Sequence, residues 1–356
     1  METLLVPYVK FAGTAAEVGR QHGELLRGRV VATWRIYQRI FERLGATEEW
    51  LREFAATIRE KILEFDETYV VEMDHIALAA GLEAWEILCL NARTEVLLAK
   101  AGIHAPAECT SIFSLGALGQ NWDWDEGLER QIVVAEIERD GHRLVTVTEP
   151  GMLGKIGLSS AGVGTTLNAL SLAPKKFGVP IHVLLRAALD APSFDAAVDK
   201  LMAAPRGTSS HILLGSADGR SVRIEFAGNG VELIKPSASY EVHTNHYLGL
   251  VDDGGSPCSF ARYARAMELA NHLPSTTLED ALRGIWNVLL DEAGTWPICR
   301  PWRKTTSSSA GALATALGRV GTVCSVVMDL RGRRLWVTRG SPIDHPDDDP
   351  REVSLS

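Results

Sequence analysis

The chain has 356 residues, 46% of them hydrophobic and 23% charged, which is typical of a globular protein with a substantial core. Its formal charge of −9 argues against nucleic acid or an anionic membrane surface as the main partner. No apolar run is long enough to span a bilayer, and the first residues lack the basic start of a secretory signal. The five cysteines stand at irregular spacing, which suits reduced thiols, so we expect a soluble cytoplasmic protein.

The first third of the chain is predicted to be helical. Apolar residues recur at helical spacing through most of residues 14–101, with charged residues on the intervening face. Residues 47–49, Thr-Glu-Glu, have the threonine cap and the acidic first turn of a helix start. A further helix is expected over residues 84–98, ending near Gly102. Residues 1–108 are therefore assigned to a helical N-terminal segment.

The rest of the chain alternates short β-branched runs with amphipathic helices. Three pairs of runs flank turn sequences and predict hairpins, at residues 131–137 with 144–147, 211–214 with 222–226, and 323–329 with 334–338. Helices are expected at residues 181–189, 194–203, 260–272 and 278–290. This order indicates an α+β fold of antiparallel sheets covered by helices. We expect the core to span 109–342 and the Asp- and Pro-rich residues 343–356 to form a loose tail.

One cysteine stands where a nucleophile would be useful. Cys109 lies in the sequence Ala-Glu-Cys-Thr-Ser and leads into an apolar, strand-like run, and Gly-Gln-Asn-Trp-Asp-Trp follows at residues 119–124. This layout is expected when self-cleavage turns a thiol into a new N-terminal residue. The freed α-amine, with a pKa of about 7.7–8.0, can then serve as the base of the thiol. The alternative is that Cys109 is a small buried hydrophobic residue.

Several polar residues stand in apolar contexts. Asp123 lies between two tryptophans and is expected to need a specific partner. Asn245 ends an extended run, where its amide could donate to an oxyanion, and Arg319 precedes a strand, from which it could reach Asp123 or a substrate. The alternatives are a turn asparagine and a surface charge. His243 and His246 are interpreted as structural histidines, and we expect no metal and no cofactor.

Taken together, these segments resemble the acyl-coenzyme A:6-aminopenicillanic acid acyltransferase family, which consists of N-terminal-nucleophile hydrolases. The matching segments run over most of the chain, at residues 13–19, 22–23, 90–95, 109–110, 119–123, 148–151, 160–163, 242–246 and 321–342. The resemblance implies an αββα sandwich and cleavage between Glu108 and Cys109, with Cys109 as the nucleophile. It also implies an N-terminal fragment that stays as a partner of the remaining chain.

The resemblance assigns further roles to residues of this sequence. Asp123, Asn245 and Arg319 fall on catalytic positions of the family. Supporting or substrate-binding positions fall on Thr110, on Ser209 with Ser210 as the adjacent alternative, and on Asn168, where related bile-salt hydrolases place an active-site asparagine.

The resemblance implies an enzyme that cleaves a small-molecule N-acyl amide or acyl thioester through a thioester on Cys109. Two positions depart from the penicillin enzyme, because Glu108 replaces a glycine and Gly318 replaces a serine. The second departure favours amide hydrolysis. Acyl transfer to an amine such as a β-lactam nucleus stays an alternative, as does an unprocessed, non-catalytic binding relative. We expect one of two roles, lining an acyl pocket or ordinary packing in the core, for Trp286, Trp296 and Trp302.

Overall fold

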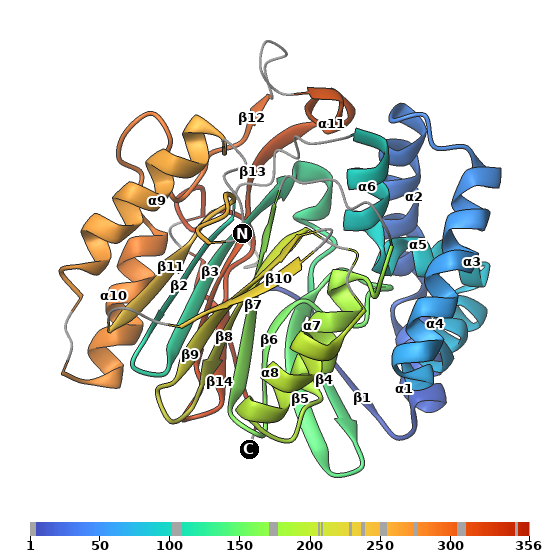
Figure 1. Cartoon of the computed structure of the whole chain (residues 1–356), viewed down its shortest axis with the longest axis horizontal. Coiled ribbons are helices and arrows are strands. Elements are labelled where there is room, and N and C mark those ends of the chain that lie inside the picture. Colours follow the sequence, from blue (N-terminus) through green and yellow to red (C-terminus); the bar gives the residue numbers. More distant parts are fainter. Residues whose placement is uncertain are drawn as a thin grey trace.

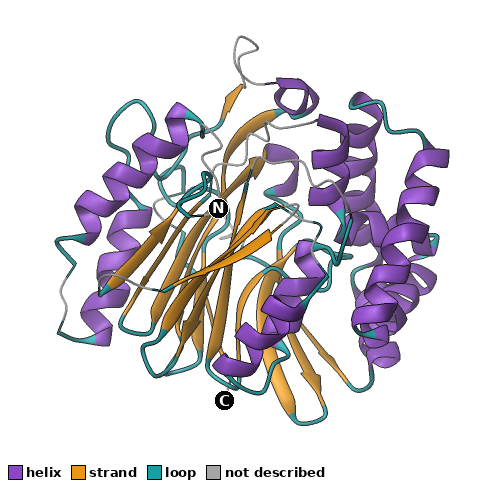
Figure 2. Cartoon of the chain, in the orientation of Figure 1, coloured by secondary structure: helices purple, strands orange, loops and turns teal. Residues whose placement is uncertain are grey.

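The structure of the protein, a computed structural model, describes residues 5–101, 109–170, 177–205, 207, 209–227, 230–235, 239–249, 255–273, 276–304, 311–345 and 348–355. Within these residues the strands form two sheets that pack face to face, and helices cover the outer face of each (Figure 1). Figure 2 shows the same arrangement by secondary structure, with further helices gathered at one side of the sheets. The predicted α+β class and the four layers of helix, sheet, sheet and helix are confirmed.

The N-terminal segment is helical after one short strand. Its elements are β1 (Tyr8–Ala12), α1 (Ala15–Leu25), α2 (Arg27–Arg43), α3 (Glu48–Phe65), α4 (Glu67–Ala80), α5 (Ala84–Asn91) and α6 (Arg93–Ala101). The Thr47 side chain caps α3 as predicted, because its oxygen accepts a hydrogen bond from the Trp50 N–H at 3.2 Å. The single helix expected over residues 84–98 is wrong, since the chain breaks at Ala92 between α5 and α6.

The first sheet has eight strands in the order β1-β4-β5-β6-β7-β8-β9-β10. Its strands after β1 are β4 (Val133–Arg139), β5 (His142–Thr148), β6 (Ile156–Ser159), β7 (Val163–Ala169), β8 (Ser210–Ser216), β9 (Ser221–Ala227) and β10 (Gly230–Ile234). β1 pairs with β4 in parallel, so the N-terminal segment contributes a strand to the core instead of forming a purely helical unit. The hairpins predicted around Gly141 and Gly219 are confirmed as β4–β5 and β8–β9.

The second sheet carries the strand that begins after Cys109. Its order is β11-β2-β3-β13-β14-β15, with β12 also paired to β13. The strands are β2 (Thr110–Ser114), β3 (Ala117–Asp125), β11 (Tyr240–His243), β12 (Arg303–Lys304), β13 (Arg319–Asp329), β14 (Arg334–Val337) and β15 (Arg351–Ser354). The third predicted hairpin is confirmed as β13–β14. A register shift in the β3–β13 pairing follows Thr322, which lies opposite Asp123.

Two pairs of helices cover the sheets. α7 (Ile181–Leu189) and α8 (Phe194–Ala203) lie on the first sheet, and α9 (Pro257–Ala270) and α10 (Leu278–Leu289) lie on the second (Figure 1). These helices match the predicted ranges within a few residues. A side chain at Gly119 would meet the Ile285 Cγ2 atom at 2.5 Å, so the glycine of the Gly-Gln-Asn-Trp-Asp segment lets α10 pack directly on β3.

The predicted loose tail is wrong for the described part of residues 343–356. β15 pairs antiparallel with β14, with Val353 opposite Leu335. The side chains of Val353 and Leu355 are buried in the main core, whereas Glu352 and Ser354, which precede each of them, are exposed. This alternation is the pattern of a half-buried strand, and the preceding Asp and Pro residues concealed it.

Two whole-molecule properties bear on the sequence-based expectations. The five cysteines are all free and buried. In the part of the chain that the structure describes, no helix combines the length and the apolar character needed to cross a membrane.

Candidate active site

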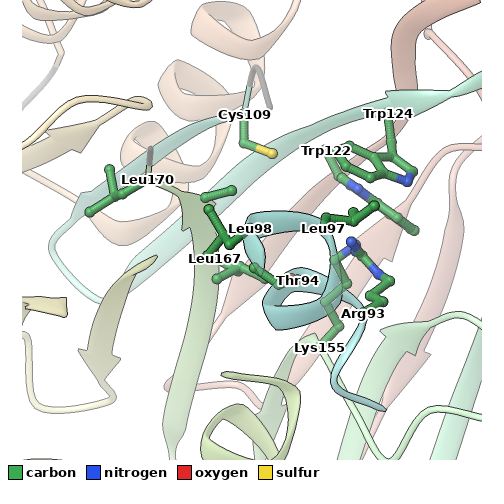
Figure 3. A pocket seen from close by; sticks show the side chains of 11 residues that line it. Arg93, Thr94, Leu97, Leu98, Cys109, Trp122, Trp124, Lys155, Leu167 and Leu170 are labelled. Carbon is green, nitrogen blue, oxygen red and sulfur yellow. The ribbon is translucent and has the colours of Figure 1, made fainter. Parts of the chain in front are cut away.

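Cys109 immediately precedes β2 and is held by contacts from other parts of the fold. Its carbonyl oxygen accepts hydrogen bonds from Arg262 Nη1 at 2.9 Å and from Asn168 Nδ2 at 3.1 Å. Its side chain is 6% exposed. Figure 3 shows the sulfur directed into a pocket. The preceding Glu108, the expected partner in self-cleavage, lies outside the described residues.

The thiol of Cys109 has a perturbed environment. Burial is the main cause that raises its pKa, and the nearby carboxylate of Asp123 raises it further. The backbone N–H of Asp123 donates to the thiol and lowers its pKa, as do the cations Lys155 and Arg262. The site therefore contains a donor and positive charges suited to a thiolate, but not enough of them to keep the isolated thiol ionised at neutral pH.

Asp123 lies near the end of β3 and is completely buried. Its Oδ1 accepts a hydrogen bond from Thr322 Oγ1 at 2.7 Å, so the expected specific partner is a hydroxyl on the neighbouring strand. Its Oδ2 has no hydrogen-bond partner among the described residues. Burial raises the pKa of Asp123 to about 7, although Arg262 and the Thr322 hydrogen bond act to lower it. Asp123 is thus a carboxyl with one oxygen free to receive another donor.

Arg262 connects the residues around Cys109, and sequence reasoning missed it. Its guanidinium is completely buried in α9 and donates to Thr110 Oγ1 at 3.0 Å and to Asn245 Oδ1 at 2.9 Å, in addition to the Cys109 carbonyl. A usable signal existed in the sequence. Arg262 stands at a spacing of four residues in a row with the small residues Cys258, Ala266 and Ala270. This spacing marks the buried face of α9.

Two asparagines complete this arrangement. Asn245 follows β11, and its Nδ2 donates to the Ala169 carbonyl at 3.0 Å. Asn168 lies on β7, and its Oδ1 accepts from Ser111 Oγ at 2.7 Å and faces His211 Nδ1 at 3.0 Å. Because their oxygens accept hydrogen bonds, both amides are oriented with their NH₂ groups toward carbonyls near the thiol.

The pocket beside Cys109 is narrow, with a cavity volume of about 30 Å³. Figure 3 shows its walls, which come from α6, β3, β7 and the residue before β6. The lining residues are Arg93, Thr94, Leu97, Leu98, Cys109, Trp122, Trp124, Lys155, Leu167, Ala169 and Leu170. Most of these residues are apolar, and the two cations among them are Arg93 and Lys155.

The two pocket cations share one buried carboxylate. Glu149 Oε2 lies 3.4 Å from Lys155 Nζ and 3.5 Å from Arg93 Nη2. The Lys155 ammonium lies 3.0 Å from the centre of the Trp122 ring, and the Arg93 guanidinium lies 5.0 Å from that of Trp124. The tryptophans of the Asn-Trp-Asp-Trp segment therefore place two positive groups along the pocket wall.

The three tryptophans expected at an acyl pocket lie elsewhere. Trp286 lines a separate hollow between α10 and β14, Trp296 is 39% exposed, and Trp302 packs over Gly321. The tryptophans that line the Cys109 pocket are Trp122 and Trp124. The expectation that an acyl pocket is lined by Trp286, Trp296 and Trp302 is therefore wrong for the pocket beside Cys109.

The histidines singled out in the sequence make hydrogen bonds inside the protein. His243 Nε2 lies 2.9 Å from Glu225 Oε1, and His246 Nδ1 lies 2.8 Å from Ser259 Oγ. Over the described ranges, no group of three or more His, Cys, Asp or Glu side chains is arranged to hold a metal ion. The observed contacts are those of structural histidines.

Comparison with known proteins identifies the family. The family model for acyl-coenzyme A:6-aminopenicillanic acid acyltransferase matches residues 113–344. The chain belongs to this family. A curated acyltransferase relative, the 40 kDa form of acyl-coenzyme A:6-aminopenicillanic-acid-acyltransferase from Emericella nidulans, is 29% identical over 96% of this chain and 94% of its own length.

Solved structures of similar shape include other enzymes. Penicillin V acylase from Agrobacterium tumefaciens has a TM-score of 0.45 at 15% identity, covering 65% of this chain and 82% of its own. The Caenorhabditis elegans ortholog of N-acylethanolamine-hydrolyzing acid amidase has 0.44 at 14%, covering 70% and 100%. A mutant of conjugated bile acid hydrolase from Clostridium perfringens has 0.43 at 10%, covering 70% and 92%.

Arg319 and Ser209, which the family resemblance assigned to the site, lie in different surroundings. Arg319 is half exposed, and its guanidinium pairs with Glu126 Oε2 at 2.6 Å, so the structure does not bring it to Asp123. Ser209 is buried, and its carbonyl accepts from the N–H of Leu170, a pocket residue, and from the Ser210 hydroxyl. Both serines thus lie close to the pocket wall.

Proposed function

We propose that this protein is a self-processing cysteine amidohydrolase that cleaves an N-acyl amide through a thioester on Cys109. The observation that carries the proposal is the environment of the thiol. It faces an apolar pocket, it receives the Asp123 N–H, and the amide of Asn245 lies close to the pocket wall. A nucleophile, an N–H donor and an apolar pocket in one place are the parts that acyl transfer requires.

The proposed first step is cleavage of the chain at Cys109. The thiol attacks the carbonyl carbon of Glu108, the peptide bond to Cys109 breaks, and water hydrolyses the resulting thioester. The new α-amine then has a pKa of about 7.7–8.0 and can relay a proton between the thiol and the leaving amine of a substrate. Asp123 is suited to orient this amine, because its Oδ2 is buried and without a partner among the described residues.

The proposed oxyanion donors are the Asp123 N–H and Asn245 Nδ2. Asn245 is oriented for this role by Arg262, whose Nη2 donates to its Oδ1 at 2.9 Å. Arg262 and Asn168 also hold the Cys109 carbonyl, so these two residues would fix the nucleophile in place before and after cleavage. Thr110 and Ser209 are proposed as supporting residues, and Arg319 as a residue of the outer surface without a role at the thiol.

A second candidate is acyl transfer, because the chain belongs to an acyltransferase family. The two reactions differ only in what resolves the thioester, water or an amine. Incubating an accepted N-acyl amide with and without 6-aminopenicillanic acid separates them. Release of free acid at an unchanged rate indicates hydrolysis, whereas a new amide formed at the expense of free acid indicates transfer.

Intact denaturing mass spectrometry tests the proposal. Purified wild type should give fragments of 108 and 248 residues (356 − 108), and Cys109→Ala should give one full-length species. Cys89→Ala is the matched control, because Cys89 is a buried cysteine of α5 outside the pocket. A single full-length species in wild type and Cys109→Ala alike would contradict self-processing and favour a non-catalytic binding relative.

A further inference from the structure

Lys155 is a buried lysine whose ammonium belongs to the same pocket as the Cys109 thiol. Its side chain is 1% exposed and lies over the Trp122 ring, with Glu149 as its ion-pair partner. Its backbone is fixed, because its N–H donates to Thr146 Oγ1 at 2.9 Å. It is the only charged residue between Glu149 and Lys175 in the sequence. A cation at this depth is costly unless it is paired, and Glu149 supplies the pair.

The proposed self-cleavage lacks a base within Cys109 itself. The α-amine can accept the thiol proton only after cleavage, because before it the Cys109 nitrogen is part of a peptide bond. The first attack therefore needs another proton acceptor. Among the described residues that line the pocket, the titratable side chains are Arg93, Cys109 and Lys155, and an arginine does not give up its proton.

The Asp123 carboxylate is the other titratable group near the thiol, and it raises the pKa of Cys109. Successive side chains of a strand point to opposite faces, and Trp122 and Trp124 of β3 line the pocket. The carboxyl of Asp123 accordingly points to the other face of β3, where Thr322 donates to it and Arg262 lowers its pKa. Lys155 is on the pocket face, the face into which the sulfur is directed (Figure 3).

We propose that the Lys155 amine accepts the proton of the Cys109 thiol during self-cleavage, an inference that rests on the proposed function. The proton moves from Sγ to Nζ as Sγ bonds to the carbonyl carbon of Glu108. The bond from that carbon to the Cys109 nitrogen breaks, and the proton passes from Nζ to this nitrogen. Water then hydrolyses the thioester, which restores the thiol and leaves a carboxylate on Glu108.

Burial of Lys155 supports a neutral amine at working pH. Burial lowers the pKa of Lys155 to about 7, Arg93 lowers it as well, and Glu149 and the thiols of Cys109 and Cys324 raise it. A general base is most effective with a pKa near the ambient pH. Because the amine must be unprotonated, the rate of the first step should rise with pH through about 7.

Three variants separate proton acceptance from positive charge. Lys155→Met removes the amine, and Lys155→Arg keeps a cation over Trp122 but removes the base. Lys100→Met is the matched control, since Lys100 lies over the Trp50 ring at 3.8 Å and does not line the pocket. Two readouts are followed by intact mass, namely the fraction of chain cleaved and the rate at which methyl methanethiosulfonate modifies Cys109 in full-length chain between pH 5.5 and 9.5.

We expect both Lys155 variants to accumulate full-length chain and to lose the rise in modification rate near pH 7. Loss of a general base lowers a rate by about 100- to 10,000-fold. Wild-type cleavage in Lys155→Arg would overturn the inference in favour of charge alone, and wild-type behaviour of both variants would overturn it altogether. If Lys155→Met fails to fold, Lys155→Arg and the double variant Lys155→Met/Glu149→Gln give the same comparison. The modification assay needs no cleavage. A wild type that is never cleaved would therefore contradict the proposed function, and the pH dependence of Cys109 modification would still test whether the Lys155 amine accepts the thiol proton.

Discussion

Replacing Asp123 by asparagine is expected to stabilise the folded protein above neutral pH. Burial raises the pKa of Asp123 from 3.8 to about 7. The unfolded chain therefore loses this proton at a lower pH than the folded protein does, and the folded state becomes less stable as pH rises from about 4 to 7. A candidate catalytic residue should thus be a source of instability at the pH at which the protein works.

The magnitude follows from the size of the shift. A change from 3.8 to about 7 corresponds to about 4 kcal/mol above pH 7, at about 1.4 kcal/mol per pKa unit. At pH 5 only about 2 kcal/mol of this cost is present. Asparagine keeps an oxygen for the Thr322 hydroxyl, and any fixed cost of its NH₂ group is equal at both pH values. The stability difference between variant and parent should therefore grow by about 2–3 kcal/mol between pH 5 and pH 8.

Urea unfolding followed by tryptophan fluorescence measures this difference. Both proteins carry Cys109→Ala, so that each is one uncleaved chain and the transitions can be compared. The free energy of unfolding is determined at pH 5 and pH 8 for the parent and for its Asp123→Asn variant. A difference that stays constant or shrinks over this range would refute the reasoning, because it would mean that the folded carboxyl ionises as easily as the unfolded one.

Further outcomes are expected at four other residues. Asn245→Ala should lower kcat by about 100- to 1000-fold on any amide that the wild type hydrolyses, since it removes an oxyanion donor; turnover within a fewfold of wild type would exclude this role. Arg319→Ala removes only an exposed ion pair with Glu126, so the free energy of unfolding measured in urea should change by less than about 1 kcal/mol. A loss of turnover as large as that of Asn245→Ala would instead restore the family-based role of Arg319. Val353→Ser should destabilise the protein by about 1.5–3 kcal/mol in urea, because a buried strand residue is lost; an unchanged midpoint would mean that β15 adds nothing. Burial lowers the pKa of His22 to about 3, so the unfolded chain binds this proton first and stability falls as pH drops below 6.5. His22→Gln should flatten the loss of stability between pH 6.5 and 4, and an equally steep loss would contradict a neutral buried His22.

Local patterns were sufficient for most of the fold. α7 and α8 begin and end where their apolar periodicity predicts, and the hairpin at Asp140 and Gly141 follows from two residues that tolerate the positive φ values of 52° and 78° found there. The break at Ala92 carried no proline or glycine, so nothing local announced it. The pairing of β1 with β4 is a long-range contact that no local pattern encodes.

The site was predicted in part, and the division has a physical reason. Cys109, Asp123, Asn168 and Asn245 stand in recognisable short motifs, and the structure brings them together. Arg262 was missed because a single arginine in a helix is usually a surface charge, and its meaning depends on which face α9 buries. Lys155 was missed for a similar reason, although its position as the sole charge in a long uncharged stretch was a usable signal.

Because β1 pairs in parallel with β4, cleavage of the chain would change how the protein refolds. Tyr8 lies opposite Val134, so the pairing joins the two sides of the proposed cut. The buried ion pair between Glu72 and Arg186, at 2.9 Å, does the same. A chain cut after residue 108 would keep its first segment as a bound subunit, and recovery from denaturant would become a second-order reaction. Its yield would rise with protein concentration, whereas refolding of the uncut Cys109→Ala chain would not depend on concentration.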